Sequence, residues 1–186
     1  MELKGNHDFK VSRTQLWIYL MDPIVLAKIT PGVSRLETLG EDKFKSISVI
    51  KIGPVKASFT GKLKVVDKNH PASFVIKMEQ LGKIGNAHVS VQMNIDEKQE
   101  GIAALTFDGK ADLSGVIART GQRVLSGVAN VITRQVFSAL EKHIEENREL
   151  EKLSLSMQSA KSNESLPSEE LPESKDSTNP EINSIV

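Results

Sequence analysis

The chain has 186 residues, in which 24 Lys and Arg balance 24 Asp and Glu, and it contains eight aromatic residues and no cysteine. This length accommodates one domain with an appendage but not two full catalytic domains. Zero net charge argues against a general nucleic-acid binder, because neutralising phosphates requires an excess of Lys and Arg. The absence of cysteine excludes disulfides, thiolate metal sites and a cysteine nucleophile.

The targeting signals of the sequence favour the cytoplasm. The opening MELKGNHDFK lacks the charged and then apolar pattern of a secretory leader. No apolar run reaches the ~20 residues that a membrane-spanning helix needs, and Asp22-Pro23 interrupts the longest one. We therefore expect a soluble, cytoplasmic globular protein.

The balanced charge is an average over two unlike segments. Residues 151–186 carry seven acidic residues and three Lys, a net charge of −4, which leaves +4 for residues 1–150. The same segment holds nine Ser and three of the seven Pro. It cannot bury enough apolar surface to offset its ordering entropy. We predict one domain over residues 1–150 and an acidic, Ser/Pro-rich tail over residues 151–186, disordered from about Ser159.

The domain begins with a strand and two short helices. Residues 2–10 alternate between an apolar or small face and a polar face, as an amphipathic strand does. Ser12 stands three residues before Gln15, the spacing of a capping box, and predicts the start of a helix. Asp22, followed by proline, is a good N-cap for a second short helix that ends near Ile29.

A series of strands follows. Apolar and polar residues alternate cleanly in each of five segments, which predicts an antiparallel sheet with one covered face. Gly53-Pro54 separates the first two segments as a hairpin turn would. The segments are residues 44–52, 55–66, 74–79, 87–95 and 102–111.

The apolar period changes to that of a helix from about Ser114, and we predict one long helix over residues 114–150. At ~1.5 Å per residue, this helix would be about 50 Å long and could cross a whole sheet. Gly121 and Gly127 lie inside it, where glycine is unfavourable by about 1 kcal/mol relative to alanine. We expect these glycines to allow a close approach of the helix to the sheet.

This order of elements predicts an α+β domain in which a curved antiparallel sheet of about seven strands surrounds one long C-terminal helix. A single helix about 10 Å wide cannot fill the concave side of such a sheet. We therefore predict an apolar cavity beneath the short helices.

Several short motifs are typical of one family. The order of elements resembles the helix-grip fold of the START (SRPBCC) and birch-pollen-allergen superfamily. Over roughly residues 1–145 the chain is more closely similar to the CoxG family, which is named for a subunit of carbon monoxide dehydrogenase. The motifs are MELKG-x-H-x-F at the start of the chain, Asp22-Pro23, Pro31-Gly32 with Leu36-Glu37, Leu39-Gly40-Glu41-Asp42, and Gly53-Pro54-Val55-Lys56 with Phe59 and Gly61-Lys62.

The resemblance implies a non-enzymatic accessory protein that binds a lipophilic ligand, with a respiratory quinone or lipid as the natural occupant and no other cofactor. It also implies a molybdenum hydroxylase of the carbon monoxide dehydrogenase type as partner, met at the inner face of the cell membrane. Some members carry an apolar C-terminal anchor. The acidic tail of this chain departs from that pattern and argues against anchoring through the C-terminus.

The predicted ligand site combines the inward residues of the helices and strands. Ser46 and Ser48 would be polar points in an otherwise apolar cavity, the usual arrangement for orienting a ligand. The opposite register, with Ile47 and Val49 facing inward, fits the sequence equally well. The candidate residues are Leu16, Leu20, Leu26, Ile29, Phe44, Ser46, Ser48, Phe59, Phe74, Ile76, Met78, Phe107, Ile117, Val124 and Val128.

A second set of residues is a candidate for the outer surface. Residues 16–21 are apolar around the whole helix, so they are either wedged in the core or form a gate that meets a ligand or a membrane. Trp17 would belong to that gate. Lys56, Lys62 and Lys64, with Lys45 and Lys51, form a basic outer face that either is simply solvated or contacts an acidic partner or anionic lipids.

Catalytic and metal sites have weak support. The four histidines are scattered over separate elements, without the convergent spacing of metal ligands. No Gly-x-Ser-x-Gly motif is present. A cyclase or aromatase of the same superfamily would depend on His7, Arg119 and Arg123 for acid–base chemistry. A chaperone-like interaction module with a closed cavity is the remaining alternative.

Overall fold

The computed structural model describes the backbone of residues 1–52 and 55–162 and the side chains of residues 1–51 and 56–156. The predicted Gly53-Pro54 turn and the tail beyond residue 162 lie outside the described residues. The chain divides into two units, Met1–Arg148 and Glu149–Val186. The fold and the site belong to the first unit.

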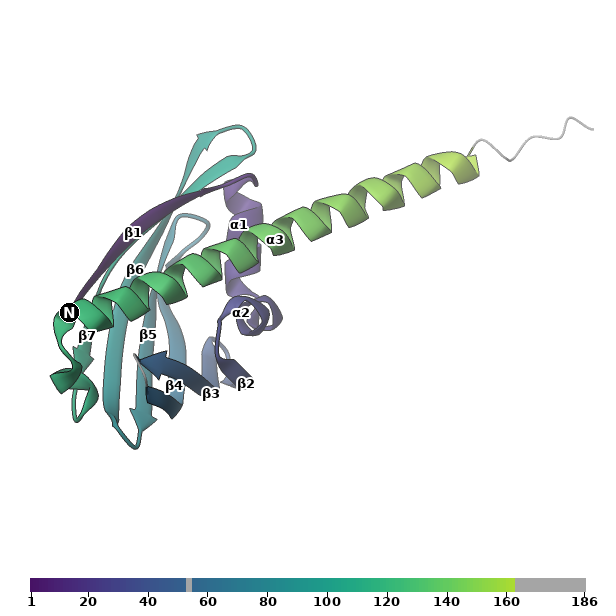
Figure 1. Cartoon of the computed structure of the whole chain (residues 1–186). Coiled ribbons are helices and arrows are strands. Elements are labelled where there is room, and N and C mark those ends of the chain that lie inside the picture. The colour runs from purple at the N-terminus through teal and green to yellow at the C-terminus, as the bar shows by residue number, and fades with distance from the viewer. Residues whose placement is uncertain (53–54, 163–186) are drawn as a thin grey trace, which may run out of the picture. The chain divides into compact units, whose positions relative to one another are not determined.

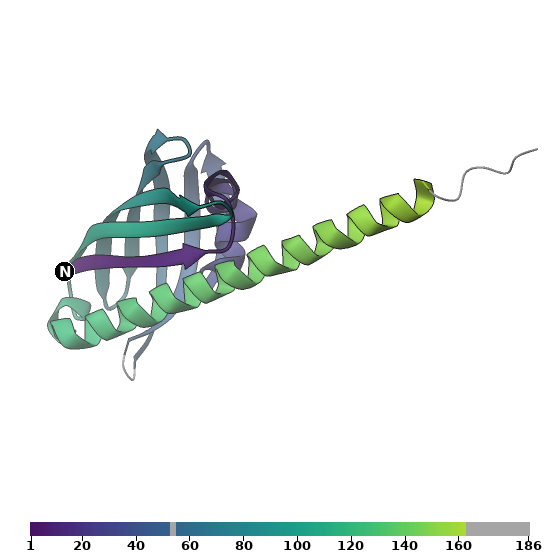
Figure 2. The same cartoon turned by 90° about the horizontal axis from the view of Figure 1, so that it is seen from above.

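Seven strands form one antiparallel sheet in the part of the chain that the structure describes. The first strand pairs with the last, so the sheet order is β1-β7-β6-β5-β4-β3-β2. Figures 1 and 2 show the sheet curving around the long helix. This confirms the predicted helix-grip architecture. The strands are β1 (Glu2–Phe9), β2 (Val33–Gly40), β3 (Lys43–Ile52), β4 (Val55–Asn69), β5 (Ser73–Gly82), β6 (Gly85–Gln99) and β7 (Ile102–Leu113).

The sequence pattern did not reveal β2. This strand lies at the edge of the sheet, its pairing with β3 is interrupted by two register shifts, and most of its residues are exposed or half-buried. An edge strand of this kind lacks the clean apolar alternation of a strand with one covered face. β4 and β6 are also longer than predicted, at 15 residues each.

Two short helices follow β1, as predicted. Ser12 caps α1 (Arg13–Met21) by accepting a hydrogen bond of 3.3 Å from the backbone N–H of Gln15. Asp22 Oδ1 caps α2 (Pro23–Ile29) by accepting a hydrogen bond of 2.7 Å from the backbone N–H of Ile24.

The long helix does not have the predicted bounds of 114–150. A short 3-10 helix, η1 (Ile117–Thr120), is followed by Gly121 with a φ of +91°, and α3 runs from Gln122 to Ser162. Gly121 breaks the helix because this positive φ is accessible mainly to glycine. A Cβ at Gly127 would meet no atom within 4 Å, so the expected close approach to the sheet is absent there.

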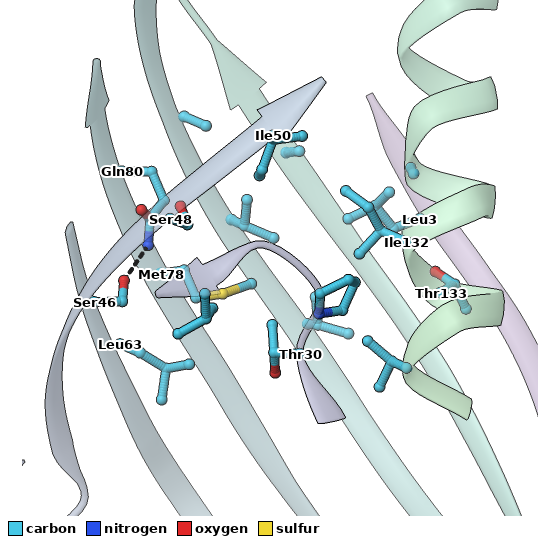
Figure 3. A pocket seen from close by; sticks show the side chains of 18 of the residues that line it. Leu3, Thr30, Ser46, Ser48, Ile50, Leu63, Met78, Gln80, Ile132 and Thr133 are labelled. Atoms are coloured by element: carbon cyan, nitrogen blue, oxygen red, sulfur yellow. Dashed lines mark hydrogen bonds between the residues drawn. The ribbon is translucent and has the colours of Figure 1, made fainter. Parts of the chain in front are cut away.

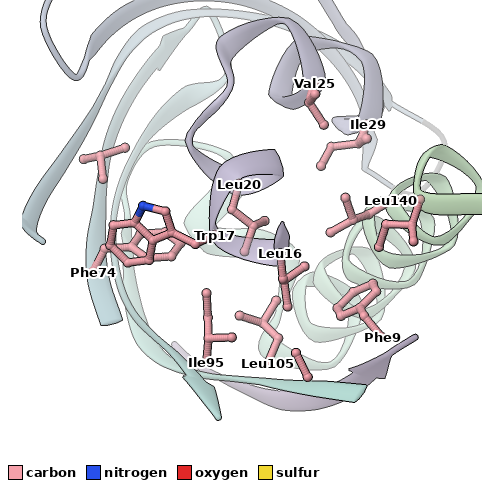
Figure 4. Packing of buried hydrophobic residues seen from close by; sticks show 13 residues of the cluster. Phe9, Leu16, Trp17, Leu20, Val25, Ile29, Phe74, Ile95, Leu105 and Leu140 are labelled. Carbon is pink, nitrogen blue, oxygen red and sulfur yellow. The ribbon is translucent and has the colours of Figure 1, made fainter. Parts of the chain in front are cut away.

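The main core lies between α1, α2, the sheet and the part of α3 around Leu140 (Figure 4). Phe9, Leu16, Leu105 and Leu140 are almost completely buried in it. The Trp17 side chain is only 7% exposed, and its ring packs edge-on against Phe74 at 5.4 Å between centroids. The interpretation of α1 as a core helix is therefore correct, and the placement of Trp17 on a partner or membrane surface is wrong.

Candidate ligand pocket

A pocket of about 430 Å³ lies between the sheet and α3 and is partly open to solvent. Figure 3 shows Ile132 and Thr133 of α3 on one side, facing residues of β3, β4 and β5 on the other. α2, the start of β2 and η1 contribute further side chains. The pocket exists because the single helix packs close to one side of the curved sheet and leaves the rest of the concave face uncovered.

The wall of the pocket is almost entirely apolar. Aliphatic, methionine and aromatic side chains from all seven strands, η1 and α3 supply most of its surface. Such a lining, with a few polar groups, is typical of sites for lipophilic small molecules, and the volume falls in the range of about 300–1,000 Å³ that such sites occupy.

The polar side chains of the wall gather on β3 and β5. Gln80 Nε2 donates a hydrogen bond of 3.0 Å to Ser46 Oγ, and Ser48 lies beside this pair (Figure 3). Both serines are only 5% exposed. The sequence left the register of residues 44–52 open, and the structure selects the register in which the two serines face inward.

A glycine makes the contact between Gln80 and Ser46 possible. Gly61 on β4 is the register partner of both residues, so the three lie side by side across three strands. A Cβ at Gly61 would lie 2.6 Å from Gln80 Cδ and would overlap the carbonyl oxygen of Glu79. The missing side chain therefore lets Gln80 cross β4 to reach Ser46.

Eight of the fifteen predicted ligand-site residues line the pocket. They come from α2, β3, β4, β5, β7, η1 and α3, and their inward direction follows from the strand and helix periods. These residues are Leu26, Ser46, Ser48, Phe59, Met78, Phe107, Ile117 and Val128.

The other seven predicted residues lie elsewhere. Leu16, Leu20, Ile29 and Phe74 are part of the main core, and Ile76 packs against it. Phe44 is buried on β3 without reaching the pocket, and Val124 is 41% exposed on α3. The core fills one end of the concave face, so inward direction alone does not distinguish a core residue from a pocket residue.

The sequence analysis missed several pocket residues. Gln80 was overlooked because the predicted strand ended at residue 79, whereas β5 continues to Gly82 with Gln80 on its inward face. Leu3, Ile132 and Thr133 also face the pocket (Figure 3). Ile132 belonged to the predicted apolar stripe of the long helix, which was the available signal.

The candidate acid–base residues do not come together in the pocket. His7 is half-buried; its Nε2 lies 2.8 Å from Glu141 Oε1, and its ring packs against Phe137. Arg119 and Arg123 are exposed. None of the three lines the pocket. Within the described residues, no group of three or more His, Asp or Glu side chains is placed to hold a metal ion.

An ion pair holds α2, one wall of the pocket, against α3. Lys28 Nζ lies 3.0 Å from Glu146 Oε2. The hydrogen bond and the charge of Lys28 lower the pKa of the Glu146 carboxyl below its ordinary value. Both side chains are well exposed, so this pair contributes little to stability.

The outer side of β3, β4 and β5 carries exposed lysines, which we call the lysine face. The register places Lys43, Lys64 and Lys77 directly opposite one another on three neighbouring strands. Among the described side chains, none of these three is within ion-pair distance of a carboxylate. The full lysine face is Lys43, Lys45, Lys51, Lys56, Lys62, Lys64 and Lys77.

Comparison with known proteins agrees with this architecture. The family model of CoxG, a subunit of carbon monoxide dehydrogenase, matches residues 5–145. No curated protein matches the chain. None of the described helices combines the length and apolar character needed to cross a membrane.

Several solved structures share the fold. A conserved protein from Geobacillus kaustophilus is 28% identical, with a TM-score of 0.76 over 78% of this chain and 96% of that chain. A START superfamily protein from Mycobacterium smegmatis is 11% identical, with a TM-score of 0.61 over 78% of this chain and 97% of that one. The Zhui aromatase/cyclase from Streptomyces sp. R1128 is 16% identical, with a TM-score of 0.56 over 78% and 93% of the two chains. The last two show the fold alone.

Proposed function

Because the chain belongs to the CoxG family of carbon monoxide dehydrogenase, we propose that it is a non-enzymatic accessory protein that binds a lipophilic ligand in its pocket. The observation that carries this proposal is a pocket of about 430 Å³ whose wall is apolar apart from a few polar side chains. Binding there removes apolar ligand surface from water, at roughly 25 cal/mol per Å² buried.

The family suggests what the ligand and the partner are. A respiratory quinone fits an apolar pocket that has polar groups on one wall, with a lipid as the other candidate. The partner would be a molybdenum hydroxylase of the carbon monoxide dehydrogenase type, which this protein would assist at the membrane by handling the quinone.

The lysine face supports peripheral contact with anionic lipid headgroups. Like charges directly opposite each other on neighbouring strands are destabilising. The Lys43, Lys64 and Lys77 row therefore has an unfavourable self-interaction that an anionic surface would relieve. Each lysine near such a surface contributes about 1 kcal/mol of attraction. Contact with the membrane would let a lipophile enter the pocket without crossing bulk water.

The two alternatives have less support. A cyclase-like enzyme would need acid–base groups within reach of a bound substrate. His7, Arg119 and Arg123 lie outside the pocket, so they do not supply these groups. A chaperone-like interaction module would have a closed cavity, which the open pocket argues against.

Native mass spectrometry of the protein purified from its own host, followed by solvent extraction, tests the proposal. We expect a bound species of lipid or quinone mass that is recovered in the organic phase. Repeated preparations with no bound lipophile, together with no binding of added quinone, would contradict it.

A further inference from the structure

The side-chain amide of Gln80 uses only one of its two ends within the protein. Its Nε2 donates to Ser46 Oγ at 3.0 Å, whereas its Oε1 is buried and accepts no hydrogen bond from any described group. A buried acceptor without a partner is unfavourable by about 1–3 kcal/mol. Because Gln80 lines the pocket, a ligand is in a position to supply the missing donor.

The neighbouring serines complete the hydrogen-bonding pattern. Ser46 Oγ accepts from Gln80, so its own O–H is available to donate. Ser48 Oγ, which has no hydrogen bond to another described residue, can donate or accept. The group on β3 and β5 therefore offers one acceptor beside one or two donors. A ligand hydroxyl, which donates once and accepts as well, satisfies all of these groups together.

We propose that the pocket selects lipophiles whose polar head carries a hydroxyl, and that Gln80 Oε1 receives the hydrogen of that hydroxyl. This inference rests on the proposed function and adds the chemistry of the ligand's head. It predicts that an alcohol, a phenol or a hydroquinone binds more tightly than the corresponding ether, ester or quinone, because these offer acceptors only.

Gly61 holds the amide in this orientation. The Gln80 side chain lies across the Cα of Gly61, with the Glu79 carbonyl beside it, and it ends at Ser46. Bonding of Nε2 to Ser46 directs Oε1 away from the serine. The acceptor is therefore fixed before the ligand arrives, which reduces the ordering that binding requires.

Two probes of similar shape separate the hydroxyl from the apolar body. 2-Naphthol carries an O–H donor, and 2-methoxynaphthalene replaces it with an ether oxygen that only accepts. Titration calorimetry of both probes on the wild-type chain should give about tenfold tighter binding of 2-naphthol, since a site with a buried acceptor discriminates against a ligand that leaves it unpaired.

The Gln80→Met variant keeps the length of the side chain and removes the acceptor. It should bind both probes with similar affinity, whereas the control Met78→Leu, a volume-conserving change in the same wall, should keep the tenfold ratio. Equal or tighter binding of 2-methoxynaphthalene by the wild-type chain would overturn the inference and leave the proposed function standing. An unchanged ratio in Gln80→Met would also overturn it. Failure of both probes to bind would overturn the inference together with the pocket's proposed function.

Discussion

Gln80 on β5 reaches across the intervening strand β4 and donates a 3.0 Å hydrogen bond to Ser46 on β3. Such a contact requires a strand position without a side chain between the two residues, and Gly61 provides it. The polar group of the pocket thus depends on a glycine that itself makes no polar side-chain contact.

The Gly61→Ala variant should therefore lose both stability and the Gln80–Ser46 contact. The new methyl group would overlap the Glu79 carbonyl oxygen and lie 2.6 Å from Gln80 Cδ. Overpacking of this kind costs about 1–3 kcal/mol of folding free energy. Urea unfolding measures the change.

Gly127→Ala is the matched control for this substitution. Gly127 lies inside α3, where an added Cβ meets no atom within 4 Å. We expect a gain of about 0.5–1 kcal/mol from the better helix propensity of alanine. A destabilised Gly127→Ala variant or an unaffected Gly61→Ala variant would contradict the packing described for the two glycines.

Trp17 should behave as a core residue and not as a gate. It is 7% exposed, packs edge-on against Phe74 and does not line the pocket. Trp17→Ala should lose about 3–5 kcal/mol of stability, as other buried aromatic residues do on truncation. Because this is the sole tryptophan of the chain, its emission can be followed directly, and it should remain blue-shifted and unchanged when a lipophile binds. A large change in emission on ligand addition would place Trp17 at the pocket.

The lysine face predicts opposite effects on stability and on membrane contact. Lys64 lies between Lys43 and Lys77 across the sheet. Lys64→Gln removes two like-charge pairs and should raise the free energy of unfolding by about 0.2–1 kcal/mol in low salt. The same variant should bind less to vesicles that contain phosphatidylserine, in a sedimentation assay.

Lys142→Gln serves as the control for Lys64→Gln, because Lys142 is exposed on α3 and is not part of the lysine face. It removes the same charge and should leave vesicle binding unchanged. Added salt should weaken the binding of the wild-type chain, as expected for exposed charges. If Lys64→Gln and Lys142→Gln reduce binding equally, net charge and not the lysine face determines the contact.

The sequence predicted directions of side chains better than it predicted their neighbours. Strict alternation placed Phe74, Ile76 and Met78 on the inward face of one strand, and that direction follows from the period of two. Phe74 and Ile76 nevertheless belong to the core, and Met78 lines the pocket. The difference depends on where α1 and α3 pack against the sheet. Those contacts join residues far apart in the chain, and no local pattern encodes them.

Local backbone signals account for the helix starts and their errors. The Ser12 and Asp22 caps were readable because each uses a side chain three or fewer residues from its partner. The break at Gly121 was not, since a glycine inside a helical pattern is compatible with continuation or with a positive φ. Gln80 was missed because a polar residue at the end of an alternating run resembles the start of a turn.

The pair between Lys28 and Glu146 predicts a small acid-dependent term in stability. Lys28 lowers the pKa of Glu146 from its ordinary value of 4.5, so folding favours the charged carboxylate. This contribution is fully present above pH 4.5 and is lost as the pH falls through the lower folded-state pKa. In Lys28→Met, stability should depend less steeply on pH in that window than in the wild-type chain.

Lys142→Met tests whether the effect belongs to the contact with Lys28. Lys142 Nζ is 3.8 Å from Glu146 Oε1 and lowers the pKa of this carboxyl less than Lys28 does. Thermal unfolding between pH 3 and pH 6 (roughly the range in which a carboxyl titrates) should therefore show a smaller change for Lys142→Met. An equal change in both variants would assign the effect to general charge.

Occupancy of the pocket tests the account most directly, and two neighbouring positions of α3 allow a matched comparison. Ile132 faces the pocket, whereas Val131 is 44% exposed (Figure 3). Ile132→Trp should fill part of the 430 Å³ volume, and Val131→Trp should leave it open. Native mass spectrometry of the two variants and the wild-type chain, each purified from the host, gives the fraction that carries a lipophile. The account predicts a bound lipophile in the wild-type chain and in Val131→Trp and its loss in a folded Ile132→Trp; equal occupancy of all three proteins would contradict the proposal that the ligand is held in this pocket.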